Sequence, residues 1–459
     1  MKQTIALLLI LCIFVACVPT PETTPILNQN GVFEEKANAV QSETQDLLLG
    51  SEQNTSFDQP YPHLSKSYMT ERGITIEMDA DILVPTVSKI PLLQMQACAI
   101  PNQRMNRFLD FFFGNQPLYD ASKGIPESKE DISESIQRMG EQLAIYEEQG
   151  DTEKINAINS ALQFKQQAYQ TAPYRSELQL SQIDRGTLHS TFDVASPSTR
   201  SGWMRLNLRD EREDGLYNIS FVDYGWNGCY TNHQAEKSLS KQLPFSEEEA
   251  IQQAKKILEN LDITDMMLSS VSYGYAYDYD THVRSDRPES VRLIWTRSVS
   301  GIPQPQVGGF AWYEQYASEN SAEYNKPWQP EYIDIEVDQN GLVCFSWYNP
   351  MEITKIVNEN IEVISLDHAL EIFDYVIDMF YSFYITNIED VWGDWAETLT
   401  VSKIEFAYQL RRQKDAPDAF ELVPCWIFSQ ENGRRILVLN AVDGTIFNSG
   451  LNAGPQNGR

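Results

Sequence analysis

The chain has 459 residues, of which 42% are hydrophobic and 11% are aromatic. This length and composition are sufficient for a large buried core and two or three domains, and they exclude a disordered chain. The formal net charge is -30 at pH 7. Such acidity argues against binding to nucleic acid and against electrostatic adhesion to anionic lipid. We therefore expect no nucleic-acid partner.

The first residues have the pattern of a lipoprotein signal. Lys2 precedes a short apolar run, Ile5 to Val15, which suits a signal-peptide core and is too short to span a bilayer. Ala16 then stands directly before Cys17, an arrangement that resembles a bacterial lipobox, in which the cysteine thiol receives diacylglycerol. An ordinary secretory signal with an incidental cysteine is the alternative. We expect residues 1–16 to be removed and Cys17 to be lipidated, which anchors the chain through acyl chains.

The segment after the cysteine begins the mature protein. Residues 17–60 are polar and contain several prolines, so we interpret them as a flexible tether on the outer face of the cytoplasmic membrane. The stretch ITIEMDADILVP then alternates apolar and polar residues, which predicts a strand with one buried face. Glu77, Asp79 and Asp81 would form a row on its opposite face. This row either binds a cation or simply faces solvent.

The next segments predict an α+β domain over residues 61–240. A second strand is expected near 89–99, and a helix near 105–113. Apolar residues at helical spacing then predict two amphipathic helices over 127–171, joined by a tight turn at Gly150. The apolar stripe of this helical hairpin either receives a partner or packs within the domain.

An internal repeat follows the N-terminal domain. The first unit, residues 241–355, begins with a helix capped by Ser246 and continues with strands. The second unit, residues 356–450, repeats this order, with Ser365 as the helix cap. The expected fold is therefore α+β: an antiparallel sheet domain with an inserted helical hairpin, followed by two helix-plus-antiparallel-sheet repeats.

Two resemblances accompany this organisation. The stretch from Ser246 to Ala254 resembles the S-x-E-E-A-I-x-x-A helix of PepSY-type modules, and Pro424 to Trp426 with Asn440 to Ile446 resembles their P-x-W and N-A-x-x-G-x-I elements. The whole mature chain resembles an uncharacterised lipoprotein family of Gram-positive bacteria that carries only a domain-of-unknown-function label. PepSY-type modules occur in extracytoplasmic proteins, so the resemblance implies a non-catalytic, partner-binding role and transfers no active-site residues.

Patterns that would indicate catalysis or metal binding are weak. The cysteines beyond Cys17 lie far apart in the sequence, which favours buried thiols and leaves disulfides as the alternative; they are Cys98, Cys229, Cys344 and Cys425. The stretch SLSK, Ser238 to Lys241, matches the S-x-x-K element of penicillin-binding enzymes but lacks its companion motifs. Asp278 and Asp280 begin like a calcium loop without its glycine and glutamate. We expect no metal, no cofactor and no enzymatic activity.

Aromatic residues supply the candidate binding surface. Tyr273, Tyr275, Tyr277 and Tyr279 alternate in SYGYAYDYD, so in a strand their rings would point the same way, away from Gly274 and Ala276. This tyrosine row either forms a binding platform or covers a core. A nearby loop rich in proline, glycine and glutamine adds further aromatic residues, which are Trp312, Tyr313, Tyr316, Trp328 and Tyr332.

The sequence thus predicts a membrane-anchored lipoprotein that binds or regulates an envelope protein or peptide. A glycan- or solute-binding lipoprotein is the first alternative, with the aromatic loop as its site. An envelope hydrolase that uses Ser238 or a carboxylate pair is the second.

Overall fold

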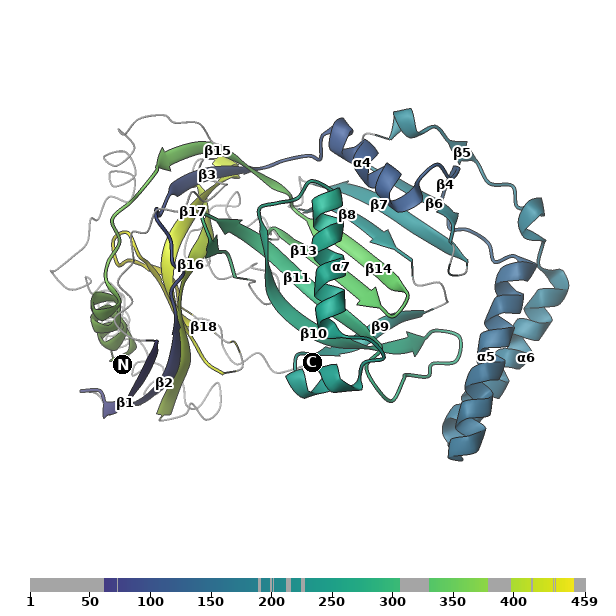
Figure 1. Ribbon diagram of the computed structural model, residues 1–459, viewed down its shortest axis with the longest axis horizontal. Coiled ribbons are helices and arrows are strands. Elements are labelled where there is room, and N and C mark those ends of the chain that lie inside the picture. The colour runs from purple at the N-terminus through teal and green to yellow at the C-terminus, as the bar shows by residue number, and fades with distance from the viewer. Residues whose placement is uncertain are drawn as a thin grey trace, which may run out of the picture.

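The computed structural model describes residues 62–449, apart from 72, 189–190, 199, 201, 212–215, 224–227, 306–329, 379–397, 414–415, 432 and 434. Its fold is α+β, with two mostly antiparallel sheets that lie next to each other (Figure 1). The chain starts in the smaller sheet, builds the larger one, and then returns to the smaller one.

The smaller sheet combines strands from both ends of the described chain. Its main path runs β1-β2-β16-β17-β18-β19, while β3 pairs with both β15 and β17. The pairing of β2 with β16 is parallel, and the other pairings are antiparallel. The strands are β1 (His63–Met69), β2 (Thr75–Leu83), β3 (Leu92–Ala97), β15 (Met351–Asn358), β16 (Thr398–Gln413), β17 (Ala416–Ser429), β18 (Arg435–Asn440) and β19 (Ile446–Ser449).

The larger sheet is antiparallel and comes from the middle of the chain. Its order is β5-β4-β6-β7-β8-β14-β13-β11-β10-β9, with β12 paired to β11. The strands are β4 (Leu118–Asp120), β5 (Gln182–Ile183), β6 (Phe192–Pro197), β7 (Trp203–Glu211), β8 (Leu216–Val222), β9 (Gly228–Gln234), β10 (Met266–Asp278), β11 (Ser290–Val299), β12 (Ile302–Pro303), β13 (Tyr332–Asp338) and β14 (Gly341–Tyr348).

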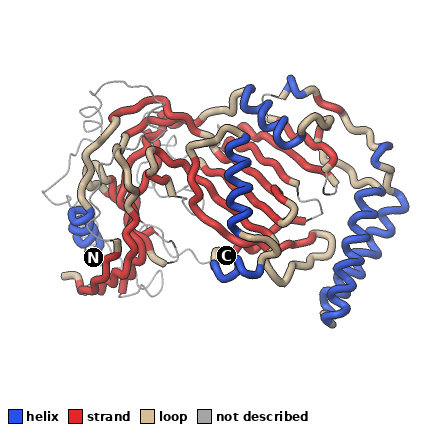
Figure 2. Tube along the Cα trace, in the orientation of Figure 1, coloured by secondary structure: helices blue, strands red, loops and turns tan. Residues whose placement is uncertain are grey.

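Helices cover one face of the larger sheet and extend beyond its side (Figure 2). The α-helices with defined bounds are α4 (Asn102–Phe113), α5 (Lys129–Gln149), α6 (Thr152–Thr171) and α7 (Glu247–Asn260), and the short 3-10 helices are η1 (Arg175–Glu177), η2 (Arg185–Thr187) and η4 (Lys237–Gln242). Side chains of α4 and α7 share one apolar core with strands β8, β11, β13 and β14. Among the described residues, no helix has the length and apolar character needed to cross a bilayer.

The helix boundaries follow from capping side chains. Ser128 starts α5, and its hydroxyl accepts a hydrogen bond from the backbone N–H of Asp131, whose carboxylate accepts one from the N–H of Ser128. Gly150 ends α5 in the left-handed conformation that glycine adopts without cost. The predicted helical hairpin and its turn are therefore confirmed.

In each of the two segments that were expected to be repeats, a helix is followed by antiparallel strands. The α7 helix starts at its cap Ser246 and precedes β10, β11, β13 and β14. A second helix, over residues 366–378, precedes β16 to β19, and the N–H of His368 donates to the capping hydroxyl of Ser365. This second helix packs its apolar side into the core of the smaller sheet.

The strands of the expected N-terminal domain are divided between the two sheets. Residues 63–97 pair within the smaller sheet, with β15, β16 and β17, whereas residues 118–234 join the larger one. The two helix-and-meander units are likewise divided, because the first completes the larger sheet and the second supplies β16 to β19, which are half of the strands of the smaller one. Strand pairing thus connects segments that are far apart in the sequence.

Candidate binding surfaces

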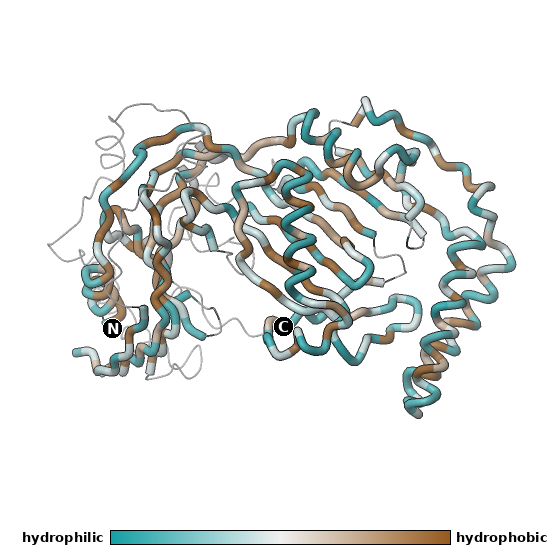
Figure 3. The backbone as a smooth tube through the Cα atoms, in the orientation of Figure 1, coloured by the Kyte–Doolittle hydropathy of each residue, from teal (hydrophilic) through white to brown (hydrophobic). Residues whose placement is uncertain are grey.

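The larger sheet has an apolar face and a polar face. Along β13, apolar and acidic residues alternate between the two faces. Ile333, Ile335 and Val337 are fully buried on the side of α4 and α7. The carboxylates of Asp334, Glu336 and Asp338 point to the other side. Figure 3 shows this alternation of hydrophobic and hydrophilic residues along the strands. We call the side opposite to α7 the polar face; it is lined by Ser220, Ser290, Arg292, Asp334, Glu336, Asp338 and Ser346.

Each carboxylate of β13 on this face has its own partner. The guanidinium of Arg292 forms a two-pronged ion pair with Asp334, with Nε to Oδ1 at 3.0 Å and Nη2 to Oδ2 at 2.5 Å. Asp338 accepts from Arg200 at 2.7 Å. Because the carboxylates are buried, these partners offset the cost of removing charge from water.

Glu336 occupies the middle of the polar face. Its Oε1 lies 2.7 Å from His233 Nε2 and accepts a hydrogen bond from the Ser290 hydroxyl, also at 2.7 Å. The neighbouring hydroxyls of Ser220 and Ser346 bond each other across β8 and β14 at 2.6 Å. The polar face is therefore a satisfied network at its centre, with its negative charges matched by partners.

The tyrosine row runs from the core to the surface. Tyr273 is 2% exposed beneath the start of α7, and its hydroxyl donates to Glu247. Burial, together with this carboxylate, raises the pKa of Tyr273 to about 12. Tyr275 and Tyr277 are half-buried, whereas Tyr279 is 51% exposed. The first ring is thus core, and the last belongs to the surface.

The glycine in this row faces the polar side, not the helix. A Cβ added at Gly274 would lie 2.4 Å from Ser290 Oγ, 2.8 Å from His233 Nε2 and 3.0 Å from Glu336 Oε1. Tyr273, the neighbour of Gly274 in the strand, occupies the side of α7 instead. Glycine is needed here because the polar network occupies the space of a side chain.

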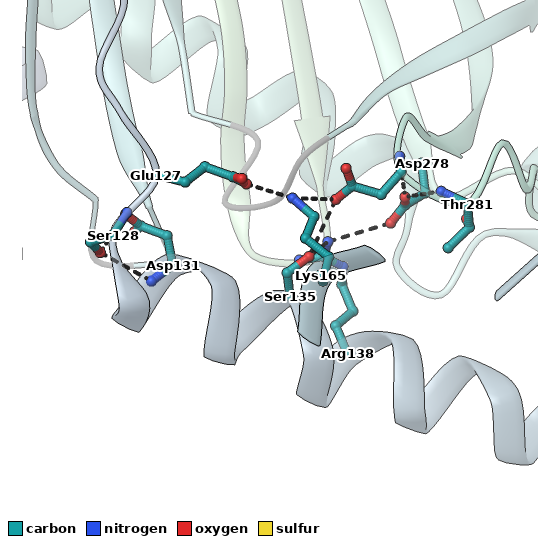
Figure 4. A network of polar contacts seen from close by, with 9 residues as sticks. Glu127, Ser128, Asp131, Ser135, Arg138, Lys165, Asp278 and Thr281 are labelled. Atoms are coloured by element: carbon teal, nitrogen blue, oxygen red, sulfur yellow. Dashed lines mark hydrogen bonds and ion pairs between the residues drawn. The ribbon is translucent and has the colours of Figure 1, made fainter. Parts of the chain in front are cut away.

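The exposed end of the tyrosine row lies at loop 278–286, which contacts the helical hairpin α5–α6. Tyr277 and Tyr279 pack edge to face with ring centroids 5.7 Å apart, and the Tyr279 hydroxyl contacts Cys229 Sγ at 3.1 Å. The hydrogen bond to Cys229, followed by burial, raises the pKa of Tyr279. We call the contacts between α5–α6 and loop 278–286 the hairpin junction (Figure 4).

A buried lysine is central to the hairpin junction. The side chain of Lys165 is 2% exposed, and its ammonium lies 2.6 Å from Glu127 Oε1 and 3.0 Å from Asp280 Oδ2. Burial alone would lower the pKa of Lys165, but the hydrogen bonds to Glu127 and Asp280 outweigh it, so the pKa lies above its ordinary value. The lysine therefore stays charged when it is buried.

The same loop contains the residues that resemble the start of a calcium site. Asp278 Oδ1 accepts the backbone N–H groups of Asp280 and Thr281 at 2.9 and 3.0 Å, and its Oδ2 lies 3.4 Å from Arg138. Lys165 supplies the cation at Asp280. In this fold the loop is thus a docking site for α5 and α6, with positive charges provided by the hairpin itself.

The apolar stripe of the hairpin is mostly used within the molecule. Met139 and Ile158 are fully buried against each other's helices, and Val283 of the junction loop completes their small cluster. Two large apolar side chains remain outside: Ile145 is 53% exposed and Phe164 is 67% exposed. The stripe residues Met139 and Ile158 thus pack within the molecule, whereas Ile145 and Phe164 lie outside the stripe and face solvent.

The acidic row of β2 lies on the surface as its alternation predicted. Ile76, Met78 and Ala80 are buried, while Asp79 and Asp81 are exposed. His63 of β1 lies between these two carboxylates, with Nδ1 3.0 Å from Asp81 and Nε2 2.9 Å from Asp79. Hydrogen bonds to Asp81 and then Asp79 raise the pKa of His63.

The structure also places the candidate serine and the cysteines that the sequence analysis considered. Ser238 is exposed on η4, and its hydroxyl donates a hydrogen bond to the carboxylate of Glu236. The later cysteines, Cys98, Cys229, Cys344 and Cys425, are free thiols. Burial, with a smaller effect of Glu331, raises the pKa of Cys98 to about 11, which disfavours its reactive thiolate form.

Cys17 and the loop residues Trp312, Tyr313, Tyr316 and Trp328 lie outside the described residues.

The carboxylates of β13 were not among the sequence candidates. The stretch YIDIEVD alternates in the same way as ITIEMDAD, so the same rule would have placed Asp334, Glu336 and Asp338 on one face. The rule does not give their partners, because Arg200, His233 and Arg292 come from other strands or loops.

Comparison with known proteins gives no functional assignment. No family model matches the chain, and no curated protein matches it. One solved structure, an uncharacterized protein from Eubacterium rectale, is 12% identical, and the match covers 92% of this chain and 98% of that chain with a TM-score of 0.41. At this score the likeness supports no conclusion about function.

Proposed function

We propose that this protein is a lipoprotein of the outer face of the cytoplasmic membrane, anchored through Cys17, that binds an envelope protein or peptide without catalysis. The anchor rests on the N-terminal sequence, since Cys17 is outside the described residues. The binding role rests mainly on one observation, the exposed apolar side chains around the helical hairpin.

Many of these apolar side chains are distributed along one part of the fold, the helical hairpin and its junction. In the described part of the chain, the exposed large hydrophobic residues are Met69, Leu83, Ile145, Phe164, Tyr174, Met267, Tyr279 and Ile446. Half of them belong to the hairpin, its base or the junction loop, which are Ile145, Phe164, Tyr174 and Tyr279. Isolated exposed apolar residues need no explanation, but a group of them on a projecting element is typical of a surface that binds another protein (Figure 1).

The two helix-and-meander units support the same proposal. We interpret them as PepSY-like units, in agreement with the motifs at Ser246 and at Asn440. The resemblance implies an extracytoplasmic partner-binding role. The hydrolase alternative has less support, because Ser238 bonds Glu236 on an exposed turn.

Site-specific photo-crosslinking in intact cells tests this proposal. A photoreactive phenylalanine analogue at Phe164 or Tyr279 should give the same crosslinked protein. The matched control is Leu83, which is 51% exposed on β2, away from the hairpin. A partner that crosslinks equally from Leu83, or no specific product from Phe164 and Tyr279, would contradict a docking role of the hairpin.

The second candidate function is binding of a glycan or small solute. The aromatic loop at 312–328 is outside the described residues, so the support for this function is the run of aromatic residues in the sequence. Tyr332, which follows this loop, stacks on Tyr348.

A further inference from the structure

We propose that the smaller sheet binds an extended, basic segment of a partner protein as an additional antiparallel strand along the outer side of β1. This surface goes beyond the hairpin surface of the proposed function, because it belongs to the other sheet (Figure 1). β1 stands at the end of the strand order of its sheet, and β2 is its only partner among the described strands. We call the side of β1 that faces away from β2 the β1 edge.

The strand register shows which backbone groups point to the β1 edge. The N–H of Ile82 donates to the carbonyl of Pro62, and the N–H of Thr70 donates to that of Ile74. In an antiparallel ladder, residues that bond the neighbouring strand alternate with residues whose N–H and C=O groups point away from it. Because the register between these two bonds is unbroken, alternate residues of β1 have outward backbone groups. They are His63, Ser65, Ser67 and Met69.

β1 lacks the features that close the other described edges. The edge strands β5 and β19 have only two and four residues, and β9 and β15 have interrupted registers with their neighbours. β1 has seven residues, a continuous register with β2 and no proline. Short strands, bulges and prolines protect natural sheet edges from pairing with another chain. Of the described edges, the β1 edge is thus the best suited to accept a further strand.

The core side of the β1 edge indicates half of the chemistry of this segment. Leu64 and Tyr68 of β1 are partly buried against the core of the smaller sheet. Side chains of an added strand on this side would therefore border apolar residues. Main-chain hydrogen bonds give affinity in strand addition, and alternate side chains give specificity. We expect every second residue of the segment to be apolar.

The solvent side indicates a basic segment. The acidic residues Asp79 and Glu77 of β2 are the Cα partners of Ser65 and Ser67, whose short side chains do not shield them from an added strand. Two strand spacings, roughly 10 Å, separate β2 from that strand, and a long lysine or arginine side chain can cross this gap toward a carboxylate. Asp79 bonds His63, whereas Glu77 makes no ion pair with a described residue. A basic residue would supply the missing cation.

Charge disfavours this chain itself as the occupant. A second copy would place its own β1 and the same acidic face of β2 beside the first. The preceding segment, residues 17–60, contains one lysine, Lys36, against seven acidic residues. Neither supplies basic residues in alternation with apolar ones, so we infer a segment of a partner protein.

Fluorescence anisotropy with the full chain in detergent micelles tests the β1 edge. The probe is a fluorescein-labelled peptide of alternating lysine and valine. In an antiparallel pair, residues opposite Ser65 and Ser67 share their face and point their N–H groups toward β1. Lysines on the solvent side therefore donate to the β1 edge, and valines donate away from it. Two control peptides of identical charge carry backbone N-methyl groups, one on its lysines and the other on its valines.

The unmodified and the valine-methylated peptides should bind saturably with similar affinity. The lysine-methylated peptide should bind about tenfold more weakly, because its N–H groups toward β1 are lost. Equal binding of the two methylated peptides would reduce the attraction to overall charge and overturn the proposal. Absence of saturable binding by the unmodified peptide would do the same.

Variants of the chain locate the binding. Ser65→Pro removes an outward N–H and spares the bonds to β2, so it should keep the circular dichroism spectrum and weaken the unmodified peptide by about tenfold. Ser65→Ala is the matched control and should bind as the wild type does. Glu77→Gln should weaken binding several-fold at low salt.

Wild-type affinity in a folded Ser65→Pro variant would refute the site. A dimer in sedimentation experiments that excludes the peptide and dissociates in Ser65→Pro would show a second copy as the occupant and overturn the proposal. If Ser65→Pro does not fold, the methylated peptides on the wild-type chain decide the question. The crosslinks from Phe164 should persist in a folded Ser65→Pro variant, so failure of the hairpin proposal and failure of this one are seen separately.

Discussion

Gly274 lies in β10, where the polar network of Ser290, His233 and Glu336 leaves no room for a side chain. A methyl group 2.4 Å from the buried Ser290 hydroxyl requires this network to shift. Gly274→Ala should therefore destabilise the protein by about 1–3 kcal/mol, the usual cost of overpacking. Urea denaturation followed by circular dichroism measures this change.

The matched control is Gly140 in α5, which has nothing within 4 Å of an added Cβ. Because glycine lowers helix stability by roughly 0.5–1 kcal/mol relative to alanine, Gly140→Ala should stabilise the hairpin or leave it unchanged. Equal effects of the two substitutions on the free energy of unfolding would show that the close contacts at Gly274 do not cause the destabilisation. The pair thus separates steric crowding from the general effect of replacing glycine.

At the scale of elements, the helical hairpin depends on its buried lysine for docking. Lys165→Met keeps the apolar stem but leaves Asp280, whose side chain is 14% exposed, without its ammonium partner. We expect a loss of about 2 kcal/mol in hairpin docking, below the ~3–5 kcal/mol of a fully buried pair, because Glu127 is half exposed. Hydrogen exchange should show this as roughly 30-fold lower protection across α5 and α6.

A second lysine of the same hairpin provides the control. Lys154 pairs with Asp286, whose side chain is 64% exposed, so Lys154→Met should change docking by no more than about 1 kcal/mol. Similar loss of protection in both variants would indicate that overall charge, not the buried contact of Lys165, holds the hairpin. Unchanged protection in Lys165→Met would show that the apolar cluster around Met139 and Val283 is sufficient.

Local patterns in the sequence predicted elements well where one residue determines the local structure. The predicted caps Ser246 and Ser365 and the predicted turn at Gly150 mark helix ends, because their interactions involve backbone groups only a few residues away. The alternation in β2 likewise identified its buried face. These features are set within a single turn or strand.

The binding surfaces depended on contacts that local patterns do not contain. Tyr273 and Tyr279 belong to the same alternating pattern, yet Tyr273 lies beneath α7 and Tyr279 is exposed just beyond the end of β10. The partner of Asp280 is Lys165 from a separate helix. Periodicity predicts which residues share a face, but the element that covers this face is chosen by tertiary packing.

At the scale of the whole molecule, the main feature is that β2 pairs in parallel with β16 near the end of the chain. A sequential arrangement of domains would instead take both neighbours of β2 from the 61–240 segment, whereas only β1 comes from it. The difference matters for folding, because the smaller sheet is complete only after the C-terminal strands have been synthesised. Contacts between segments so distant in sequence slow folding, since the intervening chain must first be closed into a loop.

An engineered disulfide tests this topology. Glu77 and Thr400 are exposed Cα partners on β2 and β16, so cysteines at both positions fall within the separation that a disulfide spans. Glu77→Cys with Thr400→Cys should form a crosslink under mild oxidation, identified by mass spectrometry of the joined peptides. Glu77→Cys with Arg209→Cys is the control, because Arg209 is exposed on β7 of the larger sheet. A crosslink to position 209 in place of position 400 would contradict the shared sheet, because two cysteines whose Cα atoms lie more than about 7 Å apart cannot be bridged without backbone movement.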